Sequence, residues 1–293
     1  MSTDFIIARV ERGEAVGGSP HAPPVIWWSF TKTVLAATVM ALVRDGKAEL
    51  DAVLPGETFT LRSLLQHTSG LPNYGGQPAY HDAVGMRLPP WTDEEFLAHT
   101  LAPQVSRPDP GSFAYSSLGY MLVRRLIEKL TGEPIDAAVD RLLLRPMNVE
   151  GVRFARTPED LAATQWGNSQ NYHPGWVAHG LLIGPPVSAA LFLDRLIMGP
   201  TIPAPLLKEM RRSIVVGSPI PGRPFVEPSY GLGVMMDPKA PAGRMVGHTG
   251  SGPLSSAAVY RFPDAKPDCT IAVFSPNPHA DATEWACVNA ARV

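Results

Sequence analysis

The segment Ser29-Phe30-Thr31-Lys32 places a hydroxyl and an amine three positions apart. Residues three apart share one face of a helix, so Lys32 is expected to reach the Ser29 hydroxyl. A serine becomes a good nucleophile when a neighbour takes its proton, and a lysine can do this if burial or another cation lowers its pKa. By itself, the tetrapeptide also fits an ordinary serine and lysine on a helix surface.

A second candidate group is Tyr115-Ser116-Ser117, which lies between the turn at Pro110–Phe113 and an apolar helical pattern. A tyrosine at such a loop edge can face a cleft. A positive charge nearby lowers the pKa of a tyrosine from its usual value of ~10, so Tyr115 beside Lys32 could pass a proton as a phenolate or as a phenol. A tyrosine half-buried at a helix start fits the same pattern.

The third candidate is the glycine-rich run from Gly247 to Gly252, which contains His248, Thr249, Gly250 and Ser251. We expect a strand to end here and a turn to begin, with glycines that let the backbone approach a ligand. Backbone N–H groups at such an edge can face an oxyanion, and His248 can donate a hydrogen bond or carry charge near neutral pH. A hairpin with an incidental histidine is the alternative.

Taken in this order, the three segments resemble the motifs of serine β-lactamases, penicillin-binding D-Ala-D-Ala peptidases, and the esterases and amidases of the same fold. Those proteins carry Ser-x-x-Lys, then Tyr-x-Asn or Ser-x-Asn, then Lys-Thr-Gly or a His-Thr-Gly-like variant on a strand. Residues 64–72 and 229–233 also resemble family segments, so the resemblance extends from Val25 to Asn277.

The resemblance implies that Ser29 attacks a carbonyl to form an acyl-enzyme, while Lys32 and Tyr115 share the general-base and general-acid work. The backbone N–H groups of Ser29 and Ser251 would form the oxyanion hole. His248 would stand on the strand edge, where it could orient substrate or tune Tyr115. The other expected binding residues are Thr249, Gly250 and Ser117, and the residues expected to be structural are His67 and Ser69.

Three departures from the family pattern bear on the substrate. Ser117 stands where the lactamases and peptidases usually have an asparagine, and a hydroxyl reaches less far and offers one donor instead of two. His248 replaces the usual lysine, which helps to hold a substrate carboxylate. Only 28 residues precede Ser29, so we expect fewer strands or a sheet edge that another subunit could cover. The first two changes favour an esterase, an amidase or a D-amino-acid peptidase over a dedicated β-lactamase.

Hydrophobic periodicity predicts the elements that position these motifs. Apolar residues at helical spacing from Val34 to Val43 predict a helix that Asp45-Gly46 ends, with Ser29 at its start. The other expected helices cover 61–66 (capped by Thr60), 118–130, 135–144, 188–198 (capped by Ser188), 206–212 and 282–291. The expected strands cover 5–10, 230–236, 244–247, 256–262 and 270–274.

This order predicts an α+β fold of the β-lactamase/transpeptidase type, with an antiparallel sheet flanked by terminal helices and a helical insertion. The sheet would take strands from both ends of the chain. We expect residues 1–54 and 185–293 to form the α/β sheet lobe and residues 55–184 the helical lobe, with the active site in the cleft between them.

Composition narrows the classes further. The 293 residues are 45% hydrophobic and 18% charged with a net charge of -2, which fits a globular chain without a basic surface for nucleic acid or membrane. Cys269 and Cys287 are expected to be reduced and packed. Neither a Gly-x-Ser-x-Gly elbow nor a dense histidine cluster is present, so an α/β-hydrolase and a metal enzyme are disfavoured, and no cofactor is expected. The first residues lack the pattern of a signal peptide, which predicts a cytoplasmic location.

The predicted function is a serine hydrolase that acts through an acyl-enzyme on a small ester, amide or short peptide. A β-lactamase or D-Ala-D-Ala carboxypeptidase-type penicillin-binding protein is one alternative, and a non-catalytic protein that binds acyl compounds is another. An apolar cleft would suit the latter, and the aromatic residues that could line one are Trp27, Trp28, Tyr74, Trp91 and Trp176. The oligomeric state and the choice between hydrolysis and acyl transfer stay open.

Overall fold

The structure is a computed structural model that describes residues 5–17, 19 and 21–293. The strands are β1 (Ile6–Glu11), β2 (Glu14–Ala15), β3 (Val25–Ile26), β4 (Arg153–Phe154), β5 (Leu182–Gly184), β6 (Ile214–Val215), β7 (Ser229–Tyr230), β8 (Met235–Ala240), β9 (Gly243–Gly252), β10 (Ser255–Phe262) and β11 (Cys269–Ser275). The helices are α1 (Phe30–Arg44), α2 (Leu61–Leu65), α3 (Pro78–Gly85), α4 (Asp93–Thr100), α5 (Ser117–Thr131), α6 (Ile135–Val139), α7 (Pro158–Ala162), α8 (Pro186–Met198), α9 (Ala204–Met210) and α10 (Ala280–Ala290). Short helical turns are η1 (Tyr74–Gly76), η2 (Asp140–Leu144) and η3 (Pro174–Trp176).

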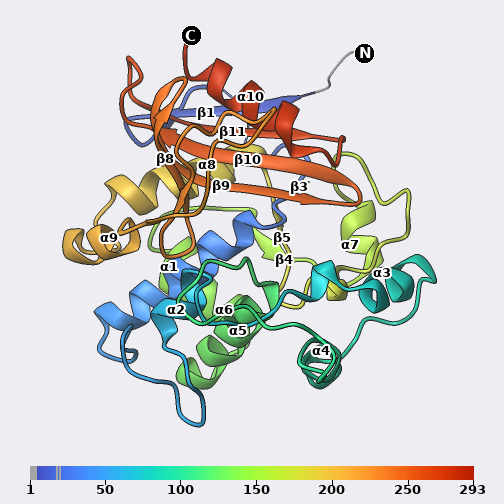
Figure 1. Cartoon of the computed structure of the whole chain (residues 1–293). Coiled ribbons are helices and arrows are strands. Elements are labelled where there is room, and N and C mark those ends of the chain that lie inside the picture. The colour runs from blue at the N-terminus through green and yellow to red at the C-terminus, as the bar shows by residue number, and fades with distance from the viewer. Residues whose placement is uncertain (1–4, 18, 20) are drawn as a thin grey trace.

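The main sheet has eight strands in the order β2-β1-β11-β10-β9-β8-β7-β6, and its neighbours pair antiparallel. Ile6 of β1 lies opposite Phe274 of β11, so the sheet joins segments from both ends of the chain, as predicted. Figure 1 shows the blue β1 strand beside the red β11 strand. A second, three-stranded sheet has the order β3-β5-β4.

The central strands are buried on both faces. Ala257 and Val259 of β10 belong to a core that includes α1 and α8, whereas Ala258 and Tyr260 pack in a second core against α10. Because successive side chains of a strand point to opposite faces, this alternation means that α8 and α10 cover opposite faces of the sheet. The two predicted cysteines, Cys269 and Cys287, are free and buried, in the α10 core.

Helix α1 is the central element of the chain. Its residues from Phe30 to Leu42 are all buried, which is the expected environment of a helix that is apolar all round. It contacts α5 and α9 as well as β9 and β10, so it joins the sheet to the helical part of the chain. In Figure 1 the sheet lies above α1, and α2, α5 and α6 gather at the opposite side.

The α+β architecture is confirmed, but several boundaries differ from the prediction. The strand predicted at 244–247 continues to Gly252, so the His248-Thr249-Gly250 motif lies inside β9 and does not start a turn. The strand predicted at 230–236 is two strands, because the chain bends at Gly233, whose φ is +71°. Helix α8 begins at Pro186, and Ser188 lies inside it and donates its hydroxyl to the Glu150 carbonyl.

Two further differences concern the helical part. The helix predicted at 135–144 is α6 followed by a π-helical turn, η2. Helices α3, α4 and α7 and the small β3-β5-β4 sheet were not predicted. The division into lobes at residues 54/55 and 184/185 stays a prediction, and residues 1–4, 18 and 20 of the sheet lobe lie outside the described residues.

Candidate active site

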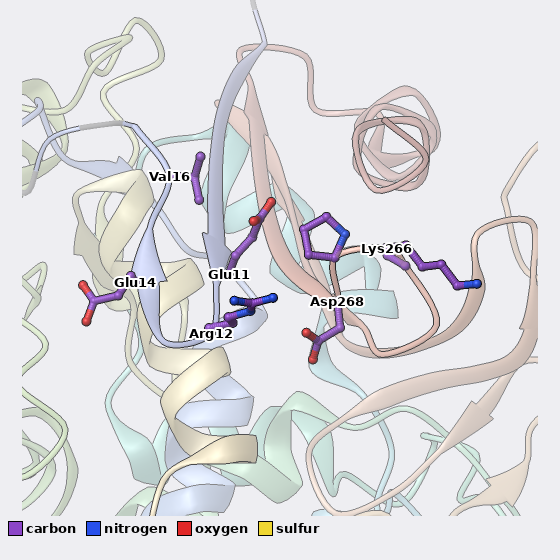
Figure 2. A pocket seen from close by; sticks show the side chains of 8 residues that line it. Glu11, Arg12, Glu14, Val16, Lys266 and Asp268 are labelled. Carbon is purple, nitrogen blue, oxygen red and sulfur yellow. The ribbon is translucent and has the colours of Figure 1, made fainter.

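The surface has several hollows, and the predicted site residues decide which of them is the candidate site. One lies between the β1–β2 turn and the loop before β11, where Glu11, Arg12 and Asp268 line it (Figure 2). This hollow contains none of the predicted site residues. A separate cleft of about 790 Å³ gathers six of them, namely Ser29, Tyr115, Ser117, His248, Thr249 and Ser251. The candidate active site is therefore this cleft, between β9 and the start of α1.

Ser29 follows a strained residue and starts α1. Trp28 has a φ of +45°, a left-handed conformation that a side chain with a Cβ disfavours by roughly 1–2 kcal/mol. The Trp28 indole is held in place by its Nε1 donor, which lies 2.8 Å from Ser255 Oγ. Ser29 is the N-cap residue of α1, yet its side chain makes no capping hydrogen bond. The hydroxyl is consequently free for other contacts.

Lys32 makes the contact with Ser29 that the spacing predicts. Its Nζ lies 3.2 Å from Ser29 Oγ and 4.9 Å from the centre of the Tyr115 ring. The side chain has no exposed surface. Burial lowers the pKa of Lys32 well below its ordinary value, because the charged ammonium loses its hydration. A neutral amine with a lone pair is the form that can take a proton from a hydroxyl.

Tyr115 is also buried, and this changes the expected ionisation. Burial raises the pKa of Tyr115 well above its ordinary value, and a hydrogen bond with Ser29 only partly opposes the rise. The expectation that this pKa is lowered is wrong, because desolvation by burial is the largest influence on the group, whereas a proton relay through a phenol stays a prediction. Tyr115 is thus a neutral phenol, which can donate a proton and receive another in exchange.

Gly250 allows β9 to pass close to the nucleophile. A Cβ atom at this position would lie 2.7 Å from the backbone nitrogen of Ser29 and 2.7 Å from Cβ of Trp28. Such distances are shorter than packed atoms tolerate, so only glycine fits without a backbone shift. The close approach brings the next residue, Ser251, to the wall of the cleft that also holds Ser29.

A chain of buried hydrogen bonds links the second and third motifs. The Ser116 N–H donates to His67 Nδ1 at 3.1 Å, so His67 carries its proton on Nε2, which lies 3.2 Å from the Tyr230 hydroxyl. Tyr230 in turn lies 2.9 Å from His248 Nε2, and His248 Nδ1 lies 2.6 Å from the Thr249 carbonyl. The backbone donor at one end fixes the direction of every bond, and His248 donates from Nδ1.

The surroundings of His248 decide between its two predicted alternatives. Burial and the nearby Lys32 lower the pKa of His248 to about 3. The ring is neutral near neutral pH, and both of its nitrogens have partners. His67 is buried too, and burial lowers its pKa well below the ordinary value. Of the two predicted alternatives, a charged ring near neutral pH is wrong, whereas a hydrogen-bond donor agrees with the contact between His248 Nδ1 and the Thr249 carbonyl.

The Thr249 hydroxyl is engaged by neighbouring side chains of the protein. Its hydroxyl lies 2.7 Å from the Tyr260 hydroxyl and donates to the buried carboxylate of Glu284. Glu284 also forms an ion pair with Arg223, which lines the cleft. The guanidinium at the cleft wall is consequently already neutralised by a carboxylate.

Two residues near the site were not predicted from the sequence. Asn73 lines the cleft, and its Oδ1 accepts hydrogen bonds from the N–H groups of Ser117 and Gly75 at 3.2 and 3.4 Å. His179 lies in a Pro/Gly-rich segment that predicts only a loop, but its Nε2 lies 3.2 Å from Lys32 Nζ. No local pattern marks either residue, because each reaches the site through a long-range contact.

A family model described as Beta-lactamase matches residues 24–286. The chain belongs to the β-lactamase family. Esterase EstB of Burkholderia gladioli is 28% identical over 162 residues, which are 48% of this chain and 41% of the relative. The putative penicillin-binding protein PbpX of Bacillus subtilis (strain 168) is 24% identical over 139 residues, 45% of this chain and 33% of that protein. The matched stretch thus spans less than half the length of these curated relatives.

Solved structures support the same fold. A D-stereospecific amidohydrolase from Streptomyces sp. superposes with a TM-score of 0.77 at 23% identity, covering 99% of this chain and 94% of that one. At this identity the likeness shows the fold alone. The predicted resemblance and the β-lactamase/transpeptidase-like fold are both confirmed.

A smaller pocket of about 420 Å³ adjoins the main cleft in this β-lactamase family member. Ser29 and Ser251 line both spaces, and Lys32 and His179 line the smaller one only. Its aromatic wall consists of Trp28, Tyr74, Tyr80, Tyr172 and Trp176. Three of the five aromatic residues predicted to line a cleft are therefore at this site, whereas Trp27 and Trp91 are not among its lining.

Two other features are absent from the described part of the chain, namely a cluster of metal ligands and a membrane-spanning helix. Within residues 5–17, 19 and 21–293, no cluster of three or more His, Cys, Asp or Glu side chains is arranged to hold a metal ion. No helix in the same ranges is both long enough and apolar enough to cross a membrane.

Proposed function

We propose that this β-lactamase family member is a serine hydrolase that cleaves a small ester or amide through an acyl-enzyme on Ser29. The observation that carries the proposal is the 3.2 Å contact between Ser29 Oγ and Nζ of the completely buried Lys32. A buried amine with a lowered pKa, beside a hydroxyl that makes no capping bond, is an arrangement that can activate a serine. The name of the relative EstB, an esterase, agrees with this chemistry.

In the proposed acylation, Lys32 takes the hydroxyl proton while Ser29 Oγ bonds to the carbonyl carbon. The developing oxyanion would accept hydrogen bonds from the backbone N–H groups of Ser29 and Ser251. Tyr115 would donate its phenol proton to the leaving oxygen or nitrogen as the scissile bond breaks, and would regain a proton from Lys32. A water molecule would then attack the acyl-enzyme, and the same groups would act in reverse.

The charges in the cleft favour a neutral substrate. A β-lactam or a peptide with a free C-terminus brings a carboxylate, which a cation would have to hold. His248 is neutral, because its pKa is lowered to about 3. Arg223 is engaged by Glu284. Both features support an ester or a neutral amide over a β-lactam as the substrate. The second candidate function is therefore that of a β-lactamase or a carboxypeptidase.

The aromatic pocket supports an apolar acyl group. Its volume of about 420 Å³ and its wall of Trp28, Tyr74 and Trp176 suit a short aliphatic or aromatic side chain beside the scissile carbonyl. On the other side of Ser29, the wider cleft would take the leaving group.

Asn73 is proposed to supply the amide that the second motif lacks. Its oxygen is engaged by backbone N–H groups, so its Nδ2 group is the part that remains for a substrate carbonyl. Ser117, whose own N–H makes one of those bonds, would serve to fix Asn73 and to line the pocket. The cleft would then still offer an amide donor, from a different position in the sequence.

The test is turnover of a short-chain p-nitrophenyl ester and of a chromogenic cephalosporin by the wild-type chain and by Ser29→Ala. We expect ester turnover that is lost in Ser29→Ala, with little cephalosporin turnover. Efficient cephalosporin turnover would instead favour the hypothesis that the protein is a β-lactamase. Absence of Ser29-dependent turnover of either compound, with no acyl-enzyme seen by mass spectrometry of the intact protein, would contradict the proposal and favour a non-catalytic acyl-binding protein.

A further inference from the structure

Besides Ser29, Lys32 has a second hydrogen-bond partner, the imidazole of His179, which the proposed chemistry does not yet use. Nζ of Lys32 lies 3.2 Å from Oγ of Ser29 and 3.2 Å from Nε2 of His179. Both side chains are buried, His179 to 97% and Lys32 completely. Among the residues that the structure describes, these are the two hydrogen-bond partners of this amine. The amine thus lies between the nucleophile and an imidazole.

The backbone around His179 is held from both sides. The Ala178 N–H donates to the Tyr74 hydroxyl at 3.0 Å, and Arg124 Nε donates to the Ala178 carbonyl at 3.1 Å. Three residues after His179, the Leu182 N–H donates to Thr31 Oγ1 at 3.1 Å. Because Thr31 directly precedes Lys32, this bond ties the imidazole segment to the same turn of α1. The position of His179 relative to Lys32 is therefore fixed by the fold.

The second ring nitrogen of His179, Nδ1, makes a histidine an unfavourable side chain if its only role is to fill space. Nδ1 is buried and has no hydrogen-bond partner among the described residues. An unpaired buried polar atom destabilises the folded chain, and an apolar side chain would fill the space without that penalty. A histidine at this position is therefore better explained by its contact with Lys32 than by packing.

We propose that His179 is a positioning residue that accepts a hydrogen bond from Lys32 and so turns the lone pair of the amine toward Ser29. This inference rests on the proposed function. A neutral amine has two N–H groups and one lone pair, and the lone pair must face Ser29 Oγ to receive its proton. An N–H group is then directed at His179, whose Nε2 must be unprotonated to accept it. The imidazole proton consequently resides on Nδ1.

The opposite tautomer would block the reaction. If Nε2 carried the proton, it would donate to the Lys32 lone pair, and the amine could no longer accept from Ser29. The other groups around the pair do not force that state: they are the neutral Tyr115 and Tyr120, the buried His67 and His248, and Arg124, which is paired with Asp93 and Glu128. After proton transfer, the same Nε2 would accept from the lysine ammonium.

The matched pair His179→Gln and His179→Met separates the hydrogen bond from packing. Both side chains are unbranched and similar in length, but only glutamine presents a carbonyl oxygen to Lys32. We expect kcat/KM of the ester to change less than about threefold in His179→Gln and to fall about tenfold or more in His179→Met. The acid limb of the pH profile should move to lower pH in His179→Met only, because the ammonium loses an acceptor. Equal losses in the two variants would overturn the proposal.

Two NMR measurements do not depend on turnover. In the wild-type chain, long-range ¹H–¹⁵N spectra of the His179 ring should show Nδ1 protonated and Nε2 bare at neutral pH. In protein labelled with ¹³Cε-lysine, the Lys32 signal should titrate at lower pH in His179→Met than in wild type or His179→Gln. A protonated Nε2, or identical titrations in Met and Gln, would overturn the proposal. A chain that shows the expected spectra but no Ser29-dependent turnover would contradict the proposed function alone, and the wild-type ring spectrum decides even if a variant does not fold.

Discussion

His248 Nε2 lies 2.9 Å from the Tyr230 hydroxyl, and this contact is the first of three hydrogen bonds that connect the strand motif to the loop that presents Tyr115. The same hydroxyl accepts from His67, which in turn accepts from the N–H of Ser116. Since His248 also donates to the Thr249 carbonyl, neither ring nitrogen is left for a substrate. His248, which stands where the family has a lysine, is thus a structural residue whose hydrogen bonds hold two parts of the cleft together.

The first prediction concerns the pH profile. The pKa of His248 is lowered to about 3 by burial and by Lys32, so protonation of this ring cannot cause a loss of activity near neutral pH. We assign the acid limb of kcat/KM to protonation of Lys32. His248→Gln should lower the rate but leave that limb within about 0.3 pH units of wild type. A profile between about pH 4 and about pH 9 in both proteins is the measurement. A limb displaced by about one unit or more in His248→Gln would return the titration to His248.

The second prediction is that Lys32 costs stability. Its folded pKa is lowered, so the folded chain holds this proton less tightly than the unfolded chain does, and the resulting penalty shrinks as pH rises toward the unfolded pKa of ~10.4. Lys32→Met should abolish turnover and raise the free energy of unfolding at neutral pH by about 1–3 kcal/mol. The gain should be smaller at about pH 9.

Urea unfolding of Lys32→Met at the two pH values measures this, with Lys47→Met as the control. Lys47 is exposed just beyond α1, so its replacement should change stability by no more than about 0.5 kcal/mol. A Lys32→Met protein less stable than wild type at neutral pH would mean that the contacts of the amine outweigh its desolvation.

The third prediction tests the close approach of β9 to the nucleophile. In Gly250→Ala the new Cβ meets the Ser29 nitrogen and Trp28 Cβ, each at 2.7 Å, so the backbone must shift. We expect a loss of about 1–3 kcal/mol in stability and at least about tenfold in kcat. Gly85→Ala is the control, because nothing lies within 4 Å of the place its new methyl group would take and it is not in the site. Thermal unfolding and ester turnover report both effects, and equal behaviour of the two variants would contradict the geometry.

The fourth prediction separates the two ends of the Asn73 amide. Asn73→Asp keeps the oxygen that accepts from Gly75 and Ser117 but removes the N–H donor. KM should rise roughly tenfold with little change in melting temperature, because the backbone anchor is kept while the donor is replaced by a carboxylate oxygen that repels a substrate carbonyl. Asn73→Ala removes the backbone anchor too, so it should lower the melting temperature as well. Steady-state kinetics that are the same in Asn73→Asp and wild type would exclude a role for Nδ2.

The sequence by itself determined the chemistry-bearing groups that depend on local spacing. Lys32 lies three residues after Ser29 on a helix, so their contact follows from helix geometry, and the motif order predicted the family. Short runs rich in apolar and β-branched residues likewise predicted β10, β11 and the strand at the start of the chain, because a strand buried on both faces can be apolar along its whole length.

Only the tertiary structure decided the contacts between distant segments and the ionisation that results from them. His179 and Asn73 lie in segments without a periodic pattern, and they reach the site because β5 pairs with β3 and because η1 packs beside α5. The charge states of His248 and Tyr115 depend on burial by residues from several elements, which no local stretch encodes. Desolvation is a property of the whole packed site, so its effect on these groups becomes visible only once the chain is folded.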